Sequence, residues 1–410
     1  MPKPLEGYRV LDLTQFFSGP WATLLLAGLG AEVIKVENPA TGDVVAMGPP
    51  YAGPKGVSFH RQSQDDLGIA YLKRTRNKKS VTLNLKDPRG LDLFYRLVEE
   101  ADVLVENFAV GVTERLKIDY ETLKKRNSRL VYCSVTGYGQ SGPDAKLKGY
   151  DAVTQAVSGL MNLTGFPDGP PTKAGSALAD SIGGTFAFGG ITTALLHRER
   201  TGQGQWVDVS MVDCLLSLVL DEPLDCYEEL GLPERLGNRI MRLSPFNAYP
   251  AKDGWLVIGA GTDTHWHNIL RAIGREELIG DQRFANLSGR ITRSEEVDAI
   301  ITEWTKERTS EEAMSQMRTF EVICGPVNTI KDILAWPHIK ARDMLQDLPH
   351  PTLGPLPDVK TAGFPIKFSD SPGRLDQPAP LSGQHNEEIL CGLLGMGKQE
   401  LEKLKGEGVI

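Results

Sequence analysis

The chain has 410 residues, of which 40% are hydrophobic and 24% are charged, a composition typical of a globular protein large enough for two domains. A formal net charge of -8 argues against a nucleic-acid-binding surface. The five cysteines form no CxxC pair and fit neither a disulfide framework nor a zinc site. With no long apolar run and no signal-peptide pattern at the start, the sequence predicts a cytoplasmic protein that does not bind membranes.

The first forty residues predict a strand, a helix and a second strand. Residues 8–13 and 32–37 are the strands, and Gly19-Pro20 precedes a helix through residues 21–27. Proline suits the first helical turn, where its missing N–H costs nothing. A strand–helix–strand unit of this length implies a right-handed crossover and a parallel sheet.

The alternation of strands and helices continues. We expect the strands at 80–85, 102–106, 130–135 and 206–210, and the helices at 91–100 and 120–125, from residue 181 in a glycine-rich segment, and at 214–220. This pattern predicts an open α/β domain with helices on both faces of the sheet.

A smaller domain is expected in the middle of the chain. A strand at 255–259 and a charged helical region at 274–309 follow an acidic segment. Beyond residue 326 the many prolines favour an extended connector with a short strand and no helix, before a last helix at 387–404. We therefore divide the chain into a large α/β domain (1–225), a small α+β domain (226–329) and a linker returning to the large domain (330–410).

A basic segment, residues 73–79, has five cations in seven residues. It fits either a solvated loop or a surface that binds a polyphosphate. The first strand–helix turn reads Phe17-Ser18-Gly19-Pro20-Trp21 and lacks the glycines that a dinucleotide pyrophosphate needs, so nicotinamide binding is not expected. The seven histidines show neither a triad nor a metal-ligand spacing, and no metal is expected.

Asp180 lies in a stretch of small and apolar residues, 175–184, which ends in two glycines. A carboxylate just before a helix start can be an N-cap. A carboxylate among small residues can also be approached by a bulky substrate and act as a nucleophile or base. The residues alone leave both interpretations open.

Several spaced motifs together resemble the class III coenzyme A transferases, the family that includes formyl-CoA transferase and carnitine CoA-transferase. These motifs are residues 7–14, 30–37, 77–84, 101–108, 137–139, 201–205, 324–327 and 381–385. The resemblance implies a Rossmann-like open-sheet large domain built from both chain ends, and two subunits interlocked as rings in a homodimer.

The resemblance also implies a mechanism. Asp180 would attack an acyl-CoA thioester to form a mixed anhydride, then carry CoA as an aspartyl thioester before an acceptor carboxylic acid takes it. Acyl-CoA is then a substrate, and no tightly bound cofactor is expected. A dry cleft is needed because water would hydrolyse the anhydride.

The same resemblance implies a set of CoA contacts. They are Phe17, Ser18, Leu83, Asn84, Leu85, Lys86, Asn107, Phe108, Arg115, Lys148 and Tyr150. The chain departs from formyl-CoA transferase where Phe17 replaces a glutamine beside the thioester and Asn38 replaces an arginine. It also lacks the run of four glycines that covers the aspartate in that enzyme.

Two other functions are weighed. The related acyl-CoA racemases use a Gly-His-Asp motif, whereas this chain has Gly149-Tyr150-Asp151, and a tyrosine with a pKa near 10 is a poor base at neutral pH. The chain could instead be a CoA-binding subunit that forms a heteromer with an active homologue. The acceptor is left open between dicarboxylates, such as oxalate or succinate, and a larger apolar acid.

Overall fold

The computed structural model describes residues 2–410, which form two compact units. The first comprises the chain up to Gly159, Ala174–Glu222 and Pro337–Ile410. The second comprises Leu160–Lys173 and Pro223–Trp336. Residues 160–173 were predicted to belong to the large domain, but their contacts group them with the second unit.

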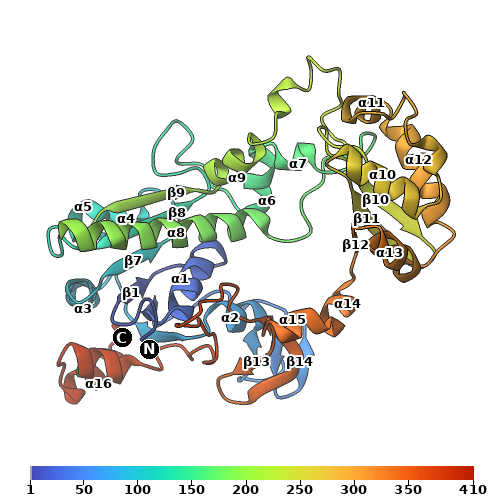
Figure 1. Ribbon diagram of the computed structural model, residues 1–410. Coiled ribbons are helices and arrows are strands. Elements are labelled where there is room, and N and C mark those ends of the chain that lie inside the picture. The colour runs from blue at the N-terminus through green and yellow to red at the C-terminus, as the bar shows by residue number, and fades with distance from the viewer. Residues whose placement is uncertain (1) are drawn as a thin grey trace. The chain divides into compact units, whose positions relative to one another are not determined.

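A six-stranded parallel sheet forms the centre of the first unit (Figure 1). Its strands are β1 (Arg9–Asp12), β2 (Glu32–Glu37), β6 (Lys78–Thr82), β7 (Val103–Glu106), β8 (Val131–Thr136) and β9 (Trp206–Ser210). They lie in the order β6-β2-β1-β7-β8-β9, which is the order of doubly wound nucleotide-binding sheets. The prediction of an α/β fold with an open parallel sheet is confirmed.

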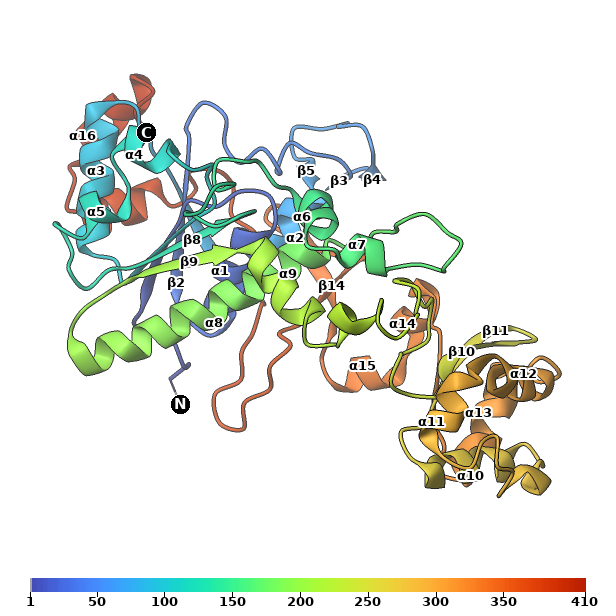
Figure 2. The same cartoon turned by 90° about the horizontal axis from the view of Figure 1, so that it is seen from above.

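Helices cover both faces of the sheet, and successive residues of a strand are buried in the cores on opposite sides. Val103 and Val105 pack in one core with residues of α1 (Ser18–Gly28), α8 (Leu178–Thr201) and α9 (Met211–Val219). Leu104 packs in the other. Figures 1 and 2 show α8 running alongside β8 and β9. The second core includes residues of α3 (Pro88–Glu99), α4 (Val112–Leu116), α5 (Tyr120–Leu123), a π-helix (Glu387–Leu393) and α16 (Lys398–Gly406).

The outer edge of β6 is paired with the C-terminal part of the chain. The Ser80 N–H donates to Nδ1 of His385 (3.1 Å), and the His385 N–H donates back to the Ser80 carbonyl (2.9 Å). The Thr82 N–H donates to the Asn386 side-chain oxygen (2.8 Å). These bonds satisfy backbone groups that an edge strand would otherwise expose.

The proline-rich segment contains two helices, so the prediction of a helix-free connector is wrong. They are α14 (Ile330–Ala335) and α15 (Pro337–Ala341). Thr329 and Asp332 form a capping box for α14, and Pro337 occupies the first position of α15, where proline is tolerated. The expected helix at 387–404 is also interrupted, because Gly395 adopts φ +71° between the π-helix and α16.

The remaining elements are short. In the first unit they are β3 (Tyr51–Gly53), β4 (Gly56–Ser58), β5 (Leu67–Gly68), α2 (Ile69–Arg74), α6 (Asp151–Val157) and the hairpin β13 (Leu345–His350) and β14 (Gly354–Ala362). The second unit has an antiparallel sheet of β10 (Phe246–Ala251), β11 (Gly254–Gly259) and β12 (Ile323–Pro326). Besides α14, its helices are α7 (Leu160–Leu163), α10 (Asp263–Ala272), α11 (Leu287–Thr292), α12 (Ser294–Thr305) and α13 (Ser310–Thr319), with 3-10 turns at Leu224–Cys226 and Glu276–Leu278. Within residues 2–410, no helix has the length and apolarity needed to cross a membrane.

Candidate active site

Asp180 lies in the first turn of α8, but it does not cap the helix. Ala177 occupies the N-cap position and makes no side-chain capping bond. Oδ1 of Asp151 accepts instead from the backbone N–H of Ala179 (2.8 Å) and of Asp180 (3.4 Å). The Asp180 carboxylate is therefore not needed for the helix, which favours the chemical interpretation of this residue over the N-cap interpretation.

Asp151 and Arg74 are the charged neighbours that affect the ionisation of the Asp180 carboxyl. Burial and the neighbouring Asp151 carboxylate raise the pKa of Asp180 to about 6, while the positive charge of Arg74 acts in the opposite direction. The carboxyl group is thus poorly solvated but mostly ionised at neutral pH. An anion in this state is more nucleophilic than a fully hydrated carboxylate.

Asp180 opens into a cavity of about 310 Å³, which we call the Asp180 cavity. Its wall is largely apolar, with Val135, Leu147 and Met211 among its residues. The predicted CoA contacts that line it are Ser18, Asn107, Phe108, Lys148 and Tyr150. The structure therefore brings five of the eleven predicted contacts to the same cavity as the predicted nucleophile.

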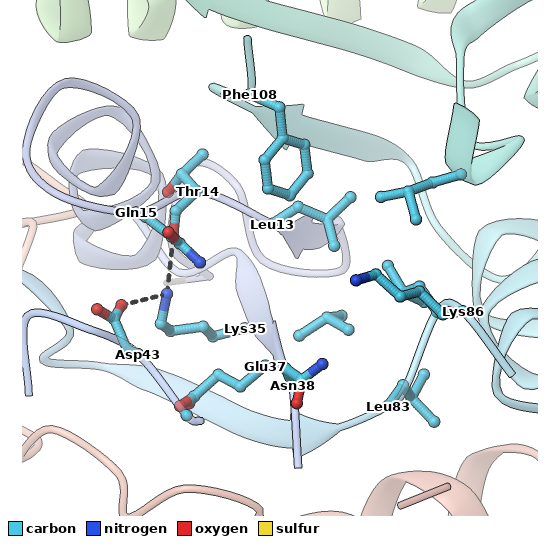
Figure 3. A pocket seen from close by; sticks show the side chains of 14 residues that line it. Leu13, Thr14, Gln15, Lys35, Glu37, Asn38, Asp43, Leu83, Lys86 and Phe108 are labelled. Carbon is cyan, nitrogen blue, oxygen red and sulfur yellow. Dashed lines mark hydrogen bonds and ion pairs between the residues drawn. The ribbon is translucent and has the colours of Figure 1, made fainter. Parts of the chain in front are cut away.

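A second cavity, of about 160 Å³, adjoins the first; we call it the Lys35 cavity (Figure 3). The predicted contacts Leu83, Leu85, Lys86 and Phe108 line it, and Figure 3 shows the Lys86 side chain directed into it. Gln15 and Phe108 line both cavities. The two cavities therefore lie on either side of these residues, an arrangement that suits a long ligand.

The loop after β1 separates the cavities, and hydrogen bonds fix the backbone of three of its residues. The Asn107 side chain accepts from the Gln15 N–H (2.9 Å) and donates to the Gln15 carbonyl (2.7 Å). The Lys35 ammonium donates to the Thr14 carbonyl (2.8 Å) and pairs with Asp43 (2.7 Å), as Figure 3 shows. Nη1 of Arg74 donates to the carbonyl of Phe16 (2.8 Å). These bonds involve the backbone of Thr14, Gln15 and Phe16, and they do not use the side chain of Gln15, a residue that lines both cavities.

Three predicted contacts do not line either cavity: Phe17, Asn84 and Arg115. Phe17 lies under the Arg74 guanidinium, whose central carbon is 3.9 Å from the ring centroid. Asn84 donates its backbone N–H to the Val409 carbonyl (2.8 Å). Arg115 is exposed on α4.

Both interpretations of the basic segment are wrong for most of its cations. Arg76 is buried and donates to the carbonyls of residues 73, 362 and 375. Lys78 is fully buried against Asp12 (2.8 Å), and Lys79 pairs with Glu32 and Glu388. These side chains hold the fold together and are neither a solvated loop nor a phosphate surface.

Sequence reasoning missed three residues that shape the site: Gln15, Arg74 and Asp151. Gln15 follows the carboxyl end of β1, the sheet edge where ligands bind in open α/β sheets, and that position was its signal. Arg74 was hidden within the basic segment. Asp151 was considered only as part of Gly149-Tyr150-Asp151, the segment compared with the Gly-His-Asp motif of the racemases. Across residues 2–410 no group of three or more His, Cys, Asp or Glu side chains is placed to hold a metal ion.

The site thus combines a poorly solvated carboxylate, an apolar cavity and an adjoining cavity with a lysine. Residues 5–386 also match the sequence profile of CoA-transferase family III. The chain belongs to this family. The family predicted from the motifs is therefore confirmed, and the protein is a class III CoA-transferase.

Relatives and solved structures match this family III CoA-transferase over nearly its whole length. The succinate–glutarate CoA-transferase of Agrobacterium fabrum is 36% identical over 392 residues, which cover 95% of this chain and 96% of that protein. The succinyl-CoA–D-citramalate CoA-transferase of Chloroflexus aurantiacus is 37% identical over 100% of this chain and 98% of its own. A crystal structure of a CAIB/BAIF family protein from Brucella suis has a TM-score of 0.81 and 35% identity, covering 96% and 100% of the two chains.

Proposed function

We propose that this enzyme moves CoA from an acyl-CoA to a carboxylic acid with Asp180 as the covalent relay. The observation that carries the proposal is the half-buried Asp180 carboxyl at the wall of an apolar cavity, with a pKa raised to about 6 by burial and by Asp151. It is ionised at neutral pH, so it can attack, and its partial burial weakens the hydration that makes a carboxylate a poor nucleophile in water.

The reaction consists of four substitutions at carbonyl carbons. An Asp180 oxygen attacks the donor thioester, the C–S bond breaks, and CoA leaves as a thiolate. The thiolate attacks the aspartyl carbonyl of the resulting anhydride, releasing the donor acid and leaving an aspartyl-CoA thioester. The acceptor carboxylate then attacks this thioester and expels the thiolate again. The thiolate finally attacks the acceptor carbonyl, which forms the new acyl-CoA and regenerates Asp180.

The two adjoining cavities support a position for CoA. We place the nucleotide end in the Lys35 cavity, where Leu83 and Leu85 offer apolar surface and Lys86 offers a cation for a phosphate. The thioester end then lies in the Asp180 cavity, past Gln15 and Phe108. Lys148 and Tyr150 line that cavity and are exposed, as contacts to an entering substrate would be.

Each attack places a negative charge on a carbonyl oxygen, which a nearby donor can stabilise. Phe17 offers no such donor at the position where formyl-CoA transferase has a glutamine. Gln15 lines both cavities, its carboxamide is an uncharged donor, and the Asn107 bonds fix its backbone. We propose that it takes this role.

The names of the relatives support a dicarboxylic substrate class, because the Agrobacterium and Chloroflexus proteins are named for succinate or succinyl-CoA with glutarate or citramalate. We extend that class, a succinyl-type donor and a dicarboxylic acceptor, to this enzyme. We also propose that it works in the cytoplasm as an interlocked homodimer, as the family resemblance implies. A heteromer with a homologous subunit is the alternative.

The relay is tested by Asp180→Asn and Asp180→Ala, with Asp92→Asn on the exposed side of α3 as the matched control. We expect both Asp180 variants to lose transfer by more than about 10⁴-fold while still binding CoA, because the covalent step has no other nucleophile. Mass spectrometry after addition of succinyl-CoA should show an adduct on Asp180 in the wild type and in Asp92→Asn. Turnover without any adduct on Asp180 contradicts the relay. Deuterium entering the α-position without an acceptor acid would instead support a racemase.

A further inference from the structure

Arg74 differs from the other cations of the basic segment. It is the last residue of α2, and only one of its side-chain nitrogens is seen to make a hydrogen bond, from Nη1 to the Phe16 carbonyl. Arg76, Lys78 and Lys79 instead each bond two or more groups of the framework. Arg74 therefore has charge and donors that the fold itself does not use.

The Arg74 side chain holds one wall of the Asp180 cavity. Phe16 lines this cavity and adopts φ +65°, a backbone conformation that costs a non-glycine residue about 1–2 kcal/mol. The bond from Arg74 to its carbonyl (2.8 Å) and the guanidinium over the Phe17 ring (3.9 Å) fix this conformation. The Phe16 ring in turn meets the edge of Tyr150, with centroids 5.6 Å apart.

Arg74 is also the cation that opposes the acidic surroundings of Asp180. Burial and Asp151 raise the pKa of Asp180, and the charge of Arg74 lowers it. The other titratable side chains lining the cavity are Lys148 and Tyr150, both exposed. Burial lowers the pKa of Arg74 to about 10, although the charges of Asp180 and, to a smaller extent, Asp43 act in the opposite direction. Arg74 thus stays protonated and charged at neutral pH.

We propose that Arg74 is a positioning residue of this site: its guanidinium bonds the Phe16 carbonyl and stacks on Phe17, and so fixes the part of the cavity wall that Phe16 forms. Its positive charge also favours the ionised form of the Asp180 carboxyl. The role in catalysis rests on the proposed function of Asp180. The effect on ionisation does not, because it can be measured in the resting enzyme.

The test compares Arg74→Gln and Arg74→Lys in the full chain. Lys73→Gln, which removes the adjacent charge of the same helix, is the control. The Asp180 carboxyl is titrated by ¹³C NMR of aspartate-labelled enzyme, with its signal assigned by its loss in Asp180→Asn. We expect Arg74→Gln to raise the midpoint from about 6 by about one pH unit, the lower end of the effect of a nearby opposite charge. Arg74→Lys and Lys73→Gln should leave it nearly unchanged.

Kinetics give a second readout. With that change in midpoint, kcat/KM of Arg74→Gln falls about fivefold more at pH 6 than at pH 8, because fewer Asp180 groups are ionised at the lower pH. Arg74→Lys keeps the charge but loses the planar contact with Phe17, so its KM for acyl-CoA rises without a change in the pH profile. Arg74→Met provides a second neutral variant, and circular dichroism checks that each variant is folded.

Three results would overturn the proposal. An unchanged Asp180 midpoint in both neutral variants removes the electrostatic role. An equal rise of the Asp180 midpoint in Lys73→Gln shows that loss of any nearby positive charge has this effect and that Arg74 has no specific role. A KM that rises only for dicarboxylic acids, at an unchanged midpoint, makes Arg74 a substrate ligand. If the midpoint moves as expected but Asp180→Asn still turns over, the relay fails and the effect of Arg74 on Asp180 stands.

Discussion

The ion pair between Asp12 and Lys78 lies beneath the loop that separates the two cavities, and breaking it should destabilise the first unit strongly. Both side chains are fully buried, and Nζ of Lys78 lies 2.8 Å from Oδ2 of Asp12. Burial alone would raise the pKa of Asp12, but the charges of Lys78 and Lys35 outweigh it and bring the pKa to about 2. Asp12 therefore remains an anion inside the protein, and Lys78→Met would leave it without its closest cation.

The expected magnitude follows from this burial. Removing one partner of a buried pair typically costs about 3–5 kcal/mol, because the remaining charge stays away from water. Lys35 and the bonds that Asp12 accepts from the Thr14 N–H (2.9 Å) and the Thr23 hydroxyl (2.8 Å) persist, which places the estimate near the lower end, at about 3 kcal/mol. In the double variant Asp12→Asn/Lys78→Met no anion is left, so we expect it to recover at least half of this loss.

Urea unfolding followed by near-ultraviolet circular dichroism measures these differences. Lys79→Met is the matched control, since Lys79 is adjacent in the same strand but pairs with Glu32 and Glu388 at the surface, where an ion pair is worth about 1 kcal/mol or less. If Lys78→Met cost no more than Lys79→Met, or the double variant were less stable than Lys78→Met alone, the reasoning would be refuted.

Two further predictions concern the site, and a third concerns the stability of the first unit. Asp151→Asn keeps an oxygen for the Ala179 N–H but removes the charge that raises the Asp180 pKa, so the acid limb of the kcat/KM profile should move down from about 6 by up to about one pH unit. Gln15→Ala should lower kcat by about 10²-fold with little change in KM, measured with succinyl-CoA as donor, because it removes a donor to the developing oxyanion. Burial raises the pKa of Glu106 to about 7, so the folded protein holds the proton of this carboxyl more tightly than the unfolded chain does. This contribution to the free energy of unfolding is fully present below the ordinary pKa near 4.5 and is lost as the pH rises through 7. The wild type should therefore lose about 2–3 kcal/mol of stability between pH 5 and 8 in urea unfolding, and Glu106→Gln should abolish that loss.

Each of these has an opposing outcome. An acid limb that stays in place or moves up in Asp151→Asn would mean that Asp151 does not act on Asp180 through charge. A Gln15→Ala enzyme that loses only acyl-CoA affinity would make Gln15 a binding residue alone. Equal pH dependence of stability in the wild type and in Glu106→Gln would assign that dependence to other groups.

The sheet could be predicted from the sequence because its signals are local, whereas the role of Asp180 was suggested by the family resemblance and stays a prediction. Strands such as 32–37 and 206–210 are short valine-containing segments next to turn residues, and the structure has them at the same positions. The helices of the proline-rich segment were missed because the capping box at Thr329 and the proline at the start of α15 were outweighed by proline content.

The contacts around Asp180 could not be predicted, since they depend on residues far apart in the chain. Arg74 contacts Phe16 across 58 residues, and Asp151 caps a helix that begins 27 residues later. In the sequence alone, nothing distinguishes the five cations of the basic segment as buried or exposed. Only the three-dimensional structure shows that Lys78, in β6, is buried against Asp12 and that Arg74, at the end of α2, bonds the carbonyl of Phe16 beside the site.

The pairing of β6 with the end of the chain has a consequence for synthesis. Ser80 and its partner His385 are separated by 305 positions, so the edge of β6 emerges from the ribosome long before the residues that cover it. During that interval a strand with unpaired N–H and C=O groups is open to association with other nascent chains. We expect fragments that stop before His385 to aggregate in expression trials, even though they contain every strand of the parallel sheet.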